Sequence, residues 1–412
     1  MVQPGDRIAV STDKEKIEGI YIDKPKLLKQ DTIIVKLSNG YNIGIDNDKI
    51  KSIKVIEEYS PEKPKKKQIK FDSALPTVSV LSAGGTISSR IDYNTGGVIA
   101  DYTAEDFVEM CPEIQANIKA RKIMGIMSED VTFEDIKKIS EEIEKEIEKV
   151  DGVVVTMGTD MLGYIASALS FAVTAGKPVI ITGAQKSIDR GSSDAFFNLA
   201  CAVNAAAKWN GAEVAVCMHG TSSDNYCLLI RGTRARKMHS SRRDAFKSIN
   251  ENALAKVYGS GEIDAINNNH KKRSEEKTIL KNKFEKNTAL VYIYPEINPE
   301  VFKAYEKYKG IILIGTGLGH IPQKVYSAIK SLIEKNIFVG MTTQCIHGRV
   351  SPSVYSALRN ISALGVVYLE DMLPETAFIK LSWLLGCGEK RIKEKMLENE
   401  KGELGNRLGY EN

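Results

Sequence analysis

Two threonines at the ends of apolar runs are the residues of this sequence best placed to do chemistry. The run Thr77–Leu81 leads through a short turn to Thr86, and the run Val153–Met157 leads to Thr159. Open α/β sheets place their ligands at the carboxyl ends of their strands, so both hydroxyls are expected at such an edge. Either turn alone is typical of an ordinary strand end, whereas the two together favour a reactive site.

Acyl transfer by a threonine requires more than its hydroxyl. The hydroxyl is a weak nucleophile, so a neighbouring base must remove its proton. Asp160 directly follows Thr159, and a lysine held against this pair could be the base, because desolvation and nearby charges tune the pKa of a lysine. Gly84 and Gly85 precede Thr86 and could offer backbone N–H groups to the oxyanion. These residue types predict threonine-based acyl chemistry.

The candidate lysine lies in the basic segment Leu229–Phe246. Composition alone leaves several interpretations of this segment open: the base of an active site, a phosphate or RNA contact, or a solvated basic loop. Spacing does not select Lys237 over the arginines beside it.

Composition limits the class of protein. The 412 residues, of which 42% are hydrophobic and 27% charged, predict a soluble globular protein of two or three domains. The net charge of +4 does not by itself imply nucleic acid, although the clustered basic residues leave local RNA contacts open. Six cysteines without a CxxC pair predict reduced, mostly buried thiols.

The sequence motifs of several classes of protein are absent. There is no signal segment and no apolar stretch long enough to span a bilayer, so we expect a cytoplasmic protein with no membrane partner. The five histidines show no metal-ligand spacing, so no metal is expected. No GxxxxGKS or GxxxxGKT motif occurs, so no ATP site is expected in this chain.

Residues 1–58 predict a small all-β unit. They contain four short strand-like runs, and Asn39–Gly40 between the last two is a strong hairpin signal. Such closely spaced strands are typical of an SH3-like barrel, which without catalytic residue types is expected to be a docking module. Residues 59–74, with two prolines and a lysine run, predict a solvated linker; an RNA-contacting arm is the alternative.

From residue 75 onward, strands alternate with helical patterns, which predicts a mainly parallel sheet with helices on both faces. The clearest helix spans 133–150, with a stripe of isoleucines and a capping box formed by Thr132 and Asp135. The last dozen residues of the chain are expected to fray. The predicted units are a larger α/β domain at 75–280, a smaller α/β domain at 287–390 and a C-terminal tail at 391–412.

Several motifs carry a family resemblance. The chain resembles the homodimeric type of L-asparaginase/glutaminase in the order and spacing of Ser82–Ile87, Met157–Asp160, Gly183–Gln185 and the region around Lys237. The resemblance extends over most of residues 75–390. It implies a core of two α/β domains, larger and smaller, with mainly parallel sheets.

Two further segments sharpen this resemblance. With Ser187–Asp194 and Arg236–Phe246 included, the chain more closely resembles the D subunits of archaeal glutamyl-tRNA(Gln) amidotransferases. The small β unit before the core points the same way, since simple asparaginases lack it.

The resemblance implies roles for the reactive residues. Thr86 and Thr159 provide the two hydroxyls, and Thr86 is expected to attack first. Asp160 binds the α-amino group of the substrate, and Lys237 supports Thr159.

It also implies roles in substrate binding. Ser128 and Glu129 match the position that binds the α-carboxylate and amine of the substrate, although many asparaginases have Gln in place of Glu129. Tyr93 lies in a glycine-rich segment that resembles the mobile lid with its catalytic tyrosine; an ordinary turn tyrosine is the alternative.

The implied function is that of a glutaminase subunit, which hydrolyses the side-chain amide of L-glutamine, or also of L-asparagine, through a threonyl acyl-enzyme. Its ammonia would pass to a partner, the E subunit, which uses ATP and Mg²⁺ to convert Glu-tRNA(Gln) to Gln-tRNA(Gln) and makes most of the tRNA contacts. The resemblance implies no cofactor for this chain. It does imply self-association through the core. The alternatives are a free-standing L-asparaginase and a non-catalytic amino-acid sensor.

Overall fold

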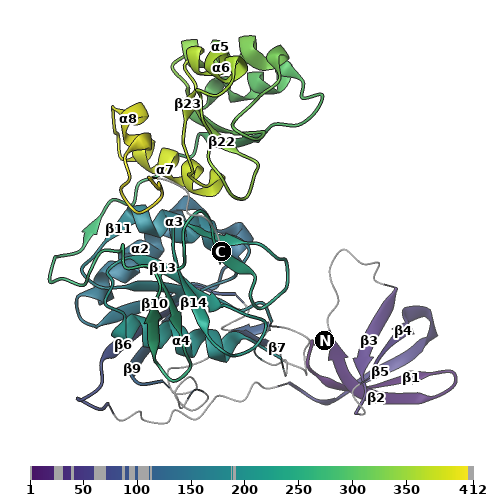
Figure 1. Cartoon of the computed structure of the whole chain (residues 1–412). Helices are drawn as coiled ribbons and strands as arrows, with labels where there is room; N and C mark the ends of the chain where they lie inside the picture. The colour runs from purple at the N-terminus through teal and green to yellow at the C-terminus, as the bar shows by residue number, and fades with distance from the viewer. Residues whose placement is uncertain are drawn as a thin grey trace.

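The computed structural model describes residues 2–22, 31–38, 41–59, 71–85, 89–91, 98–100, 111, 114–186, 188 and 192–406. Three units follow one another along the chain: an N-terminal antiparallel sheet, a larger α/β unit and a smaller α/β unit (Figure 1). The predicted fold class, a two-domain α/β core preceded by a small β unit, is confirmed.

The N-terminal unit is a five-stranded antiparallel sheet in the order β4-β3-β2-β1-β5. Its strands are β1 (Arg7–Thr12), β2 (Lys16–Ile22), β3 (Thr32–Lys36), β4 (Asn42–Asp46) and β5 (Ile50–Glu57). The sequence predicts the first four. It misses β5, because most residues of this strand are exposed and lysines interrupt its apolar alternation.

The turn at Asn39–Gly40 lies outside the described residues, but Lys36 and Asn42 pair across it as a hairpin requires. Most of the predicted linker at 59–74 also lies outside them.

The larger unit is built on an eight-stranded mixed sheet in the order β18-β17-β14-β13-β12-β10-β6-β9. In chain order the strands are β6 (Thr77–Ser82), β9 (Asn117–Lys122), β10 (Gly152–Thr156), β12 (Val179–Thr182), β13 (Val214–His219), β14 (Cys227–Arg231), β17 (Ala255–Val257) and β18 (Ile263–Ala265). The strands from β9 to β13 in this order are parallel, whereas β14, β17 and β18 extend the sheet antiparallel.

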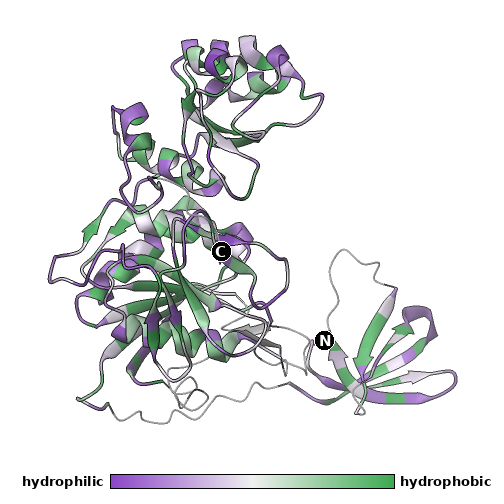
Figure 2. Ribbon diagram, in the orientation of Figure 1, coloured by the Kyte–Doolittle hydropathy of each residue, from purple (hydrophilic) through white to green (hydrophobic). Residues whose placement is uncertain are grey.

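Among the described residues, three helices cover this sheet: α2 (Phe133–Ile147), α3 (Leu162–Ala172) and α4 (Ala195–Lys208). α2 and α3 contribute to one apolar core and α4 to another, so they cover opposite faces. Figure 2 shows the central strands as the most hydrophobic part of this unit. The near-continuous apolar runs of β10 and β12 follow from burial on both faces.

The N-terminus of α2 has the predicted capping box. Thr132 Oγ1 accepts a hydrogen bond from the Asp135 N–H, and the Asp135 carboxylate accepts one from the Thr132 N–H. We expect Thr132→Ala to lower the free energy of unfolding by about 1 kcal/mol, measured by urea denaturation. Glu144→Ala, at an exposed position of the same helix, should change it by less than about 0.5 kcal/mol. Equal losses in both variants would argue against the cap.

The smaller unit has a parallel sheet in the order β20-β21-β22-β23. Its strands are β20 (Thr288–Tyr292), β21 (Gly310–Gly315), β22 (Phe338–Thr343) and β23 (Val367–Tyr368). Helices α5 (Tyr326–Glu334) and α6 (Ser356–Ala363) share its core. Helix α7 (Pro374–Gly386) packs against both this sheet and α3, so it joins the two α/β units.

Three pairs of short strands complete the strands of the described residues. They are β7 (Ser89–Ile91) with β8 (Val98–Ala100), β11 (Val173–Thr174) with β19 (Ile279–Leu280), and β15 (Ala235–Lys237) with β16 (Phe246–Ser248).

The C-terminal segment corrects one prediction. After helix α8 (Ile392–Leu397), residues 401–405 are buried or half-buried and Leu404 lies in the core, whereas the sequence predicts fraying from about residue 401. Lys380 Nζ lies 2.6 Å from Glu403 Oε1, and both side chains are fully buried. For residues 401–405 the prediction was wrong, because a composition rich in lysine and glutamate suggests exposure, whereas these charges are buried as a pair. Residues 407–412 lie outside the described residues.

Two further expectations concern the chain as a whole. Four of the six cysteines are buried and two are exposed, as predicted for structural thiols. Within the part of the chain that the structure describes, no helix is long and apolar enough to cross a membrane.

Candidate active site

The loops after two adjacent parallel strands meet at one edge of the larger sheet. β6 and β10 pair in parallel, so their carboxyl ends lie together. Gly85 approaches the second loop so closely that a Cβ there would lie 2.3 Å from the Gly158 nitrogen, and its φ of +82° favours glycine. The segments that lead to Thr86 and Thr159 are therefore in direct contact.

Lys237 contacts both the predicted hydroxyl and the predicted carboxylate. Its Nζ donates hydrogen bonds to Thr159 Oγ1 at 2.9 Å and to Asp160 Oδ1 at 2.7 Å. Thr159 is buried and the Lys237 side chain is 15% exposed, whereas the Asp160 side chain is 66% exposed. The geometry thus selects Lys237 from its basic segment, and it leaves the carboxylate accessible to a ligand.

The strand that carries Lys237 is fixed by ion pairs at its start. Arg234 Nη1 lies 3.0 Å from Asp371 Oδ2, and both side chains are buried. Arg236 Nε lies 3.4 Å from Glu375 Oε1, on the first turn of α7. These contacts hold β15 against the segment that joins the two α/β units, which limits the freedom of the lysine.

Ser128 and Glu129 lie beside this group, on a short 3₁₀ turn (Ser128–Asp130) before α2. The Asp160 N–H donates to Ser128 Oγ at 3.2 Å, and Ser128 Oγ donates to Glu129 Oε2 at 3.4 Å. A Cβ on Gly158 would lie 2.8 Å from Ser128 Oγ, so a glycine is required between the two loops. The predicted substrate-binding pair thus lies next to the predicted reactive groups.

An open cavity of about 320 Å³ adjoins them. It is lined by Asp160, Lys237, Met238, His239 and Ser240. His239 has a structural role, because its Nδ1 accepts hydrogen bonds from the N–H groups of Ser241 and Arg242 at 3.1 Å each. Asp160 and Lys237 thus lie at a hollow that is open to solvent and accessible to a small molecule.

Sequence reasoning misses one positioning residue, Asp194. Its fully buried carboxylate accepts hydrogen bonds from two backbone N–H groups of the loop 183–186 and from Asn198 Nδ2. Asn198 Nδ2 also donates to Gly183 O, and a Cβ on Gly183 would lie 2.9 Å from Thr159 Cγ2. Asp194 therefore holds the loop that packs against the threonine. The sequence shows that Asp194 directly precedes a helix, α4, which is a common position for a capping residue. It does not show which loop the carboxylate contacts.

Family models match three parts of the chain. The model described as "Asparaginase, N-terminal" matches residues 77–271, and "Glutaminase/Asparaginase C-terminal domain" matches residues 287–396. The model described as "GatD N-terminal domain" matches residues 2–56.

Full-length relatives decide the family. The D subunit of glutamyl-tRNA(Gln) amidotransferase from Pyrococcus abyssi is 45% identical over 97% of this chain and 93% of that protein. The D subunit from Methanosphaera stadtmanae is 43% identical over 98% of this chain and 94% of that protein. The chain belongs to the family of glutamyl-tRNA(Gln) amidotransferase D subunits. The membership implies a partner subunit in an amidotransferase complex.

Solved asparaginases share the core of this D-subunit family member. The thermostable L-asparaginase from Thermococcus kodakarensis superposes with a TM-score of 0.72 at 29% identity, covering 80% of this chain and all of that one. L-asparaginase I from Vibrio cholerae gives 0.70 at 28% identity, covering 81% and 100%. The asparaginase-like core predicted from the motifs is confirmed, and about a fifth of this chain has no counterpart in these enzymes.

The structure brings together five of the seven predicted site residues. These are Ser128, Glu129, Thr159, Asp160 and Lys237. The other two, Thr86 and Tyr93, lie outside the described residues. Among the residues that are described, no three His, Cys, Asp or Glu side chains are grouped as metal ligands would be.

The arrangement in this D-subunit family member can support acyl transfer. An unprotonated Lys237 amine can accept the proton of the Thr159 hydroxyl, and a protonated one can hold the Asp160 carboxylate. The N–H groups of a glycine turn can stabilise an oxyanion beside them.

The contact between the two loops can be tested at Gly85. In Gly85→Ala the new Cβ would clash with the Gly158 loop, and the residue would keep a positive φ that is unfavourable for alanine. We therefore expect about a hundredfold loss of amidase activity. Gly125→Ala is the matched control, because its Cβ would meet only the flexible end of Lys122, at 3.5 Å. Comparable activity in the two variants would show that the spacing of these loops does not matter for catalysis.

Proposed function

We propose that this chain is the glutaminase subunit of a tRNA-dependent amidotransferase, hydrolysing the side-chain amide of L-glutamine. The observation that carries the proposal is the similarity to D subunits along nearly the whole chain, including the N-terminal domain. The contact of Lys237 with Thr159 and Asp160 supports it, because an amino-acid sensor would not need these reactive groups together.

In the proposed reaction the Thr86 oxygen attacks the carbonyl carbon of the amide, and its proton passes to a base. The carbon–nitrogen bond then breaks and the nitrogen leaves, with an added proton, as ammonia. Water hydrolyses the threonyl ester to release L-glutamate. Lys237 and Thr159 relay protons beside the reacting carbonyl group.

Substrate recognition in this proposal uses the accessible groups of the site. Asp160 binds the α-amino group, since its carboxylate is exposed to the cavity and already accepts a cationic donor. Ser128 and Glu129 bind the α-carboxylate and amine, and Tyr93 closes over the substrate on a lid. L-asparagine is the second substrate to be tested.

The partner is proposed to be the E subunit, which binds ATP, Mg²⁺ and most of the tRNA, and receives the ammonia. This chain would need no cofactor and no metal of its own, would act in the cytoplasm, and would associate with a second copy of itself through the asparaginase-like core.

The decisive experiment compares ammonia release from L-glutamine by the purified chain alone and by the chain with its co-purified partner, Glu-tRNA(Gln) and ATP. We expect release to be strongly stimulated in the complex and to be lost in Thr86→Ala. Full, unstimulated activity of the lone chain would instead identify a free-standing asparaginase. Ligand binding without turnover under every condition would identify a sensor.

A further inference from the structure

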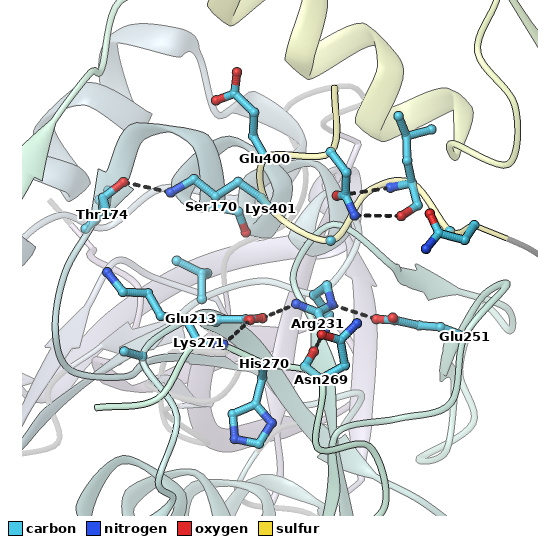
Figure 3. Close-up of a pocket in the computed structure, with 18 residues that line it drawn as sticks. Ser170, Thr174, Glu213, Arg231, Glu251, Asn269, His270, Lys271, Glu400 and Lys401 are labelled. Atoms are coloured by element: carbon cyan, nitrogen blue, oxygen red, sulfur yellow. Dashed lines mark hydrogen bonds and ion pairs between the residues drawn. The ribbon is translucent and has the colours of Figure 1, made fainter. Parts of the chain in front are cut away.

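A second cavity, of about 320 Å³, lies between the larger sheet and the C-terminal segment (Figure 3). Its walls come from the end of α3 and β11, from Arg231, from Asn269–Lys271 and from residues 399–402 and 404–406. None of the candidate active-site residues lines it. The volume is at the lower end for small-molecule pockets, so the cavity fits a metabolite of amino-acid size.

Charged groups dominate this cavity, and most of them are paired. Arg231, which is 4% exposed, contacts Glu213 through Nη1 and donates to Glu251 Oε1 at 2.7 Å through Nε. Its Nη2 donates to Asn269 O at 2.5 Å. Figure 3 shows this row of ionic contacts along one wall. Because the guanidinium group of Arg231 already has these partners, Arg231 is not the group that would bind a ligand.

Lys401 is different. Its Nζ donates to Thr174 Oγ1 at 2.7 Å, and among the described residues it makes no ion pair. Burial lowers the pKa of Lys401, and the nearby ammonium group of Lys271 lowers it further, whereas the carboxylates around the cavity act in the opposite direction. The two ammonium groups repel each other, and an anion in direct contact with both would relieve this repulsion.

The neighbouring carboxylates are committed to other groups. Glu403 forms the fully buried pair with a lysine of α7. Glu213 contacts Arg231 and accepts a hydrogen bond from the Lys271 N–H. Glu400 lies 3.8 Å from Lys395. The cavity thus holds an amine that forms no direct ion pair with a carboxylate in the part of the chain that the structure describes.

We propose that this cavity binds a small metabolite through an oxyanion group, a carboxylate or a phosphate, held by Lys401 with Thr174 and Lys271. The Thr174 hydroxyl is a second donor beside the amine, and Lys271 adds the second positive charge, since its own ion pair is with the exposed Glu276. The site is separate from the candidate active site, and its occupation does not depend on the amidase function.

The test titrates inorganic phosphate and L-glutamate, separately and at constant ionic strength, into the full chain. All proteins carry Asp160→Ala, so that glutamate is not held at the candidate active site. Binding is measured by calorimetry and by the rise in Tm that a ligand of the folded state produces. We expect at least one probe to bind, and Lys401→Met to weaken it about tenfold or more.

Matched variants locate the binding. Lys303→Met removes a lysine that is 68% exposed in the smaller unit, and it should leave affinity unchanged. Thr174→Val and Lys271→Met should each weaken binding, and they decide the question if Lys401→Met does not fold. Binding of phosphate alone or of glutamate alone would identify the oxyanion. Binding of neither at millimolar concentration, or binding unaffected by all three variants, would overturn the proposal.

Discussion

Replacing Lys237 with methionine should reduce the kcat for ammonia release by about 10²- to 10⁴-fold, the range for loss of a positioned acid–base group. Methionine keeps most of the apolar volume of lysine but has no donor and no charge. The variant would leave Thr159 Oγ1 and Asp160 Oδ1 without the amine that lies 2.9 and 2.7 Å from them. The measurement is an ammonia assay on the complex with partner, Glu-tRNA(Gln), ATP and L-glutamine.

Two further variants make this result specific. Lys247→Met changes a lysine on β16 of the same hairpin, which pairs with Asp244 and does not line the active-site cavity, so activity should stay near that of the unmodified protein. Lys237→Arg keeps the positive charge but replaces the compact amine with a larger, planar guanidinium group. Because this group cannot give up a proton as an amine can, activity should still be low. A folded Lys237→Met protein with full activity would remove this lysine from the mechanism.

Glu403→Gln should lower the free energy of unfolding by about 3–5 kcal/mol, because it leaves the Lys380 charge buried without a counter-charge, with only neutral hydrogen-bond acceptors beside it. Glu403 also accepts the backbone N–H groups of Glu400 and Lys401, and so it organises the whole C-terminal segment. The measurement is chemical denaturation of the full chain, with the transition followed by two probes to check that it is cooperative.

The double variant Lys380→Met with Glu403→Gln is the internal control. It removes both charges, so it should lose less stability than the sum of the two single changes. Glu334→Gln breaks an exposed ion pair with Lys330 and should cost less than about 1 kcal/mol. If Glu403→Gln were no more damaging than Glu334→Gln, the buried pair would not anchor the segment.

Periodicity predicts the core elements of this fold well, since each pattern reports burial within a single element. The isoleucine stripe of α2 lies in the core as expected, and the apolar run of β10 is buried at every position. The strand β5 is missed because it has little buried surface and so leaves little pattern.

The site could be predicted only in part from the residues themselves. Thr159 and Asp160 follow from their place after a buried strand. Lys237 does not, because its contact with Thr159 joins residues 78 positions apart, and several arginines share its segment. Here the motif resemblance supplied what spacing could not. Asp194 and the buried pair of the C-terminal segment escape prediction for the same reason, since charged residues reveal their burial only through distant partners.

The position of the C-terminal segment has a consequence for the order of events in the cell. The turn between β14 and β15 is held by this segment: Thr233 Oγ1 donates to Lys401 O, and Arg234 Nε donates to Gly402 O. A ribosome synthesises this segment after the rest of the α/β core. A nascent chain therefore contains Thr159 and Lys237 before the segment that holds the turn next to β15 has been made. We therefore expect a chain that lacks this segment to be inactive even when the rest of the α/β core is present.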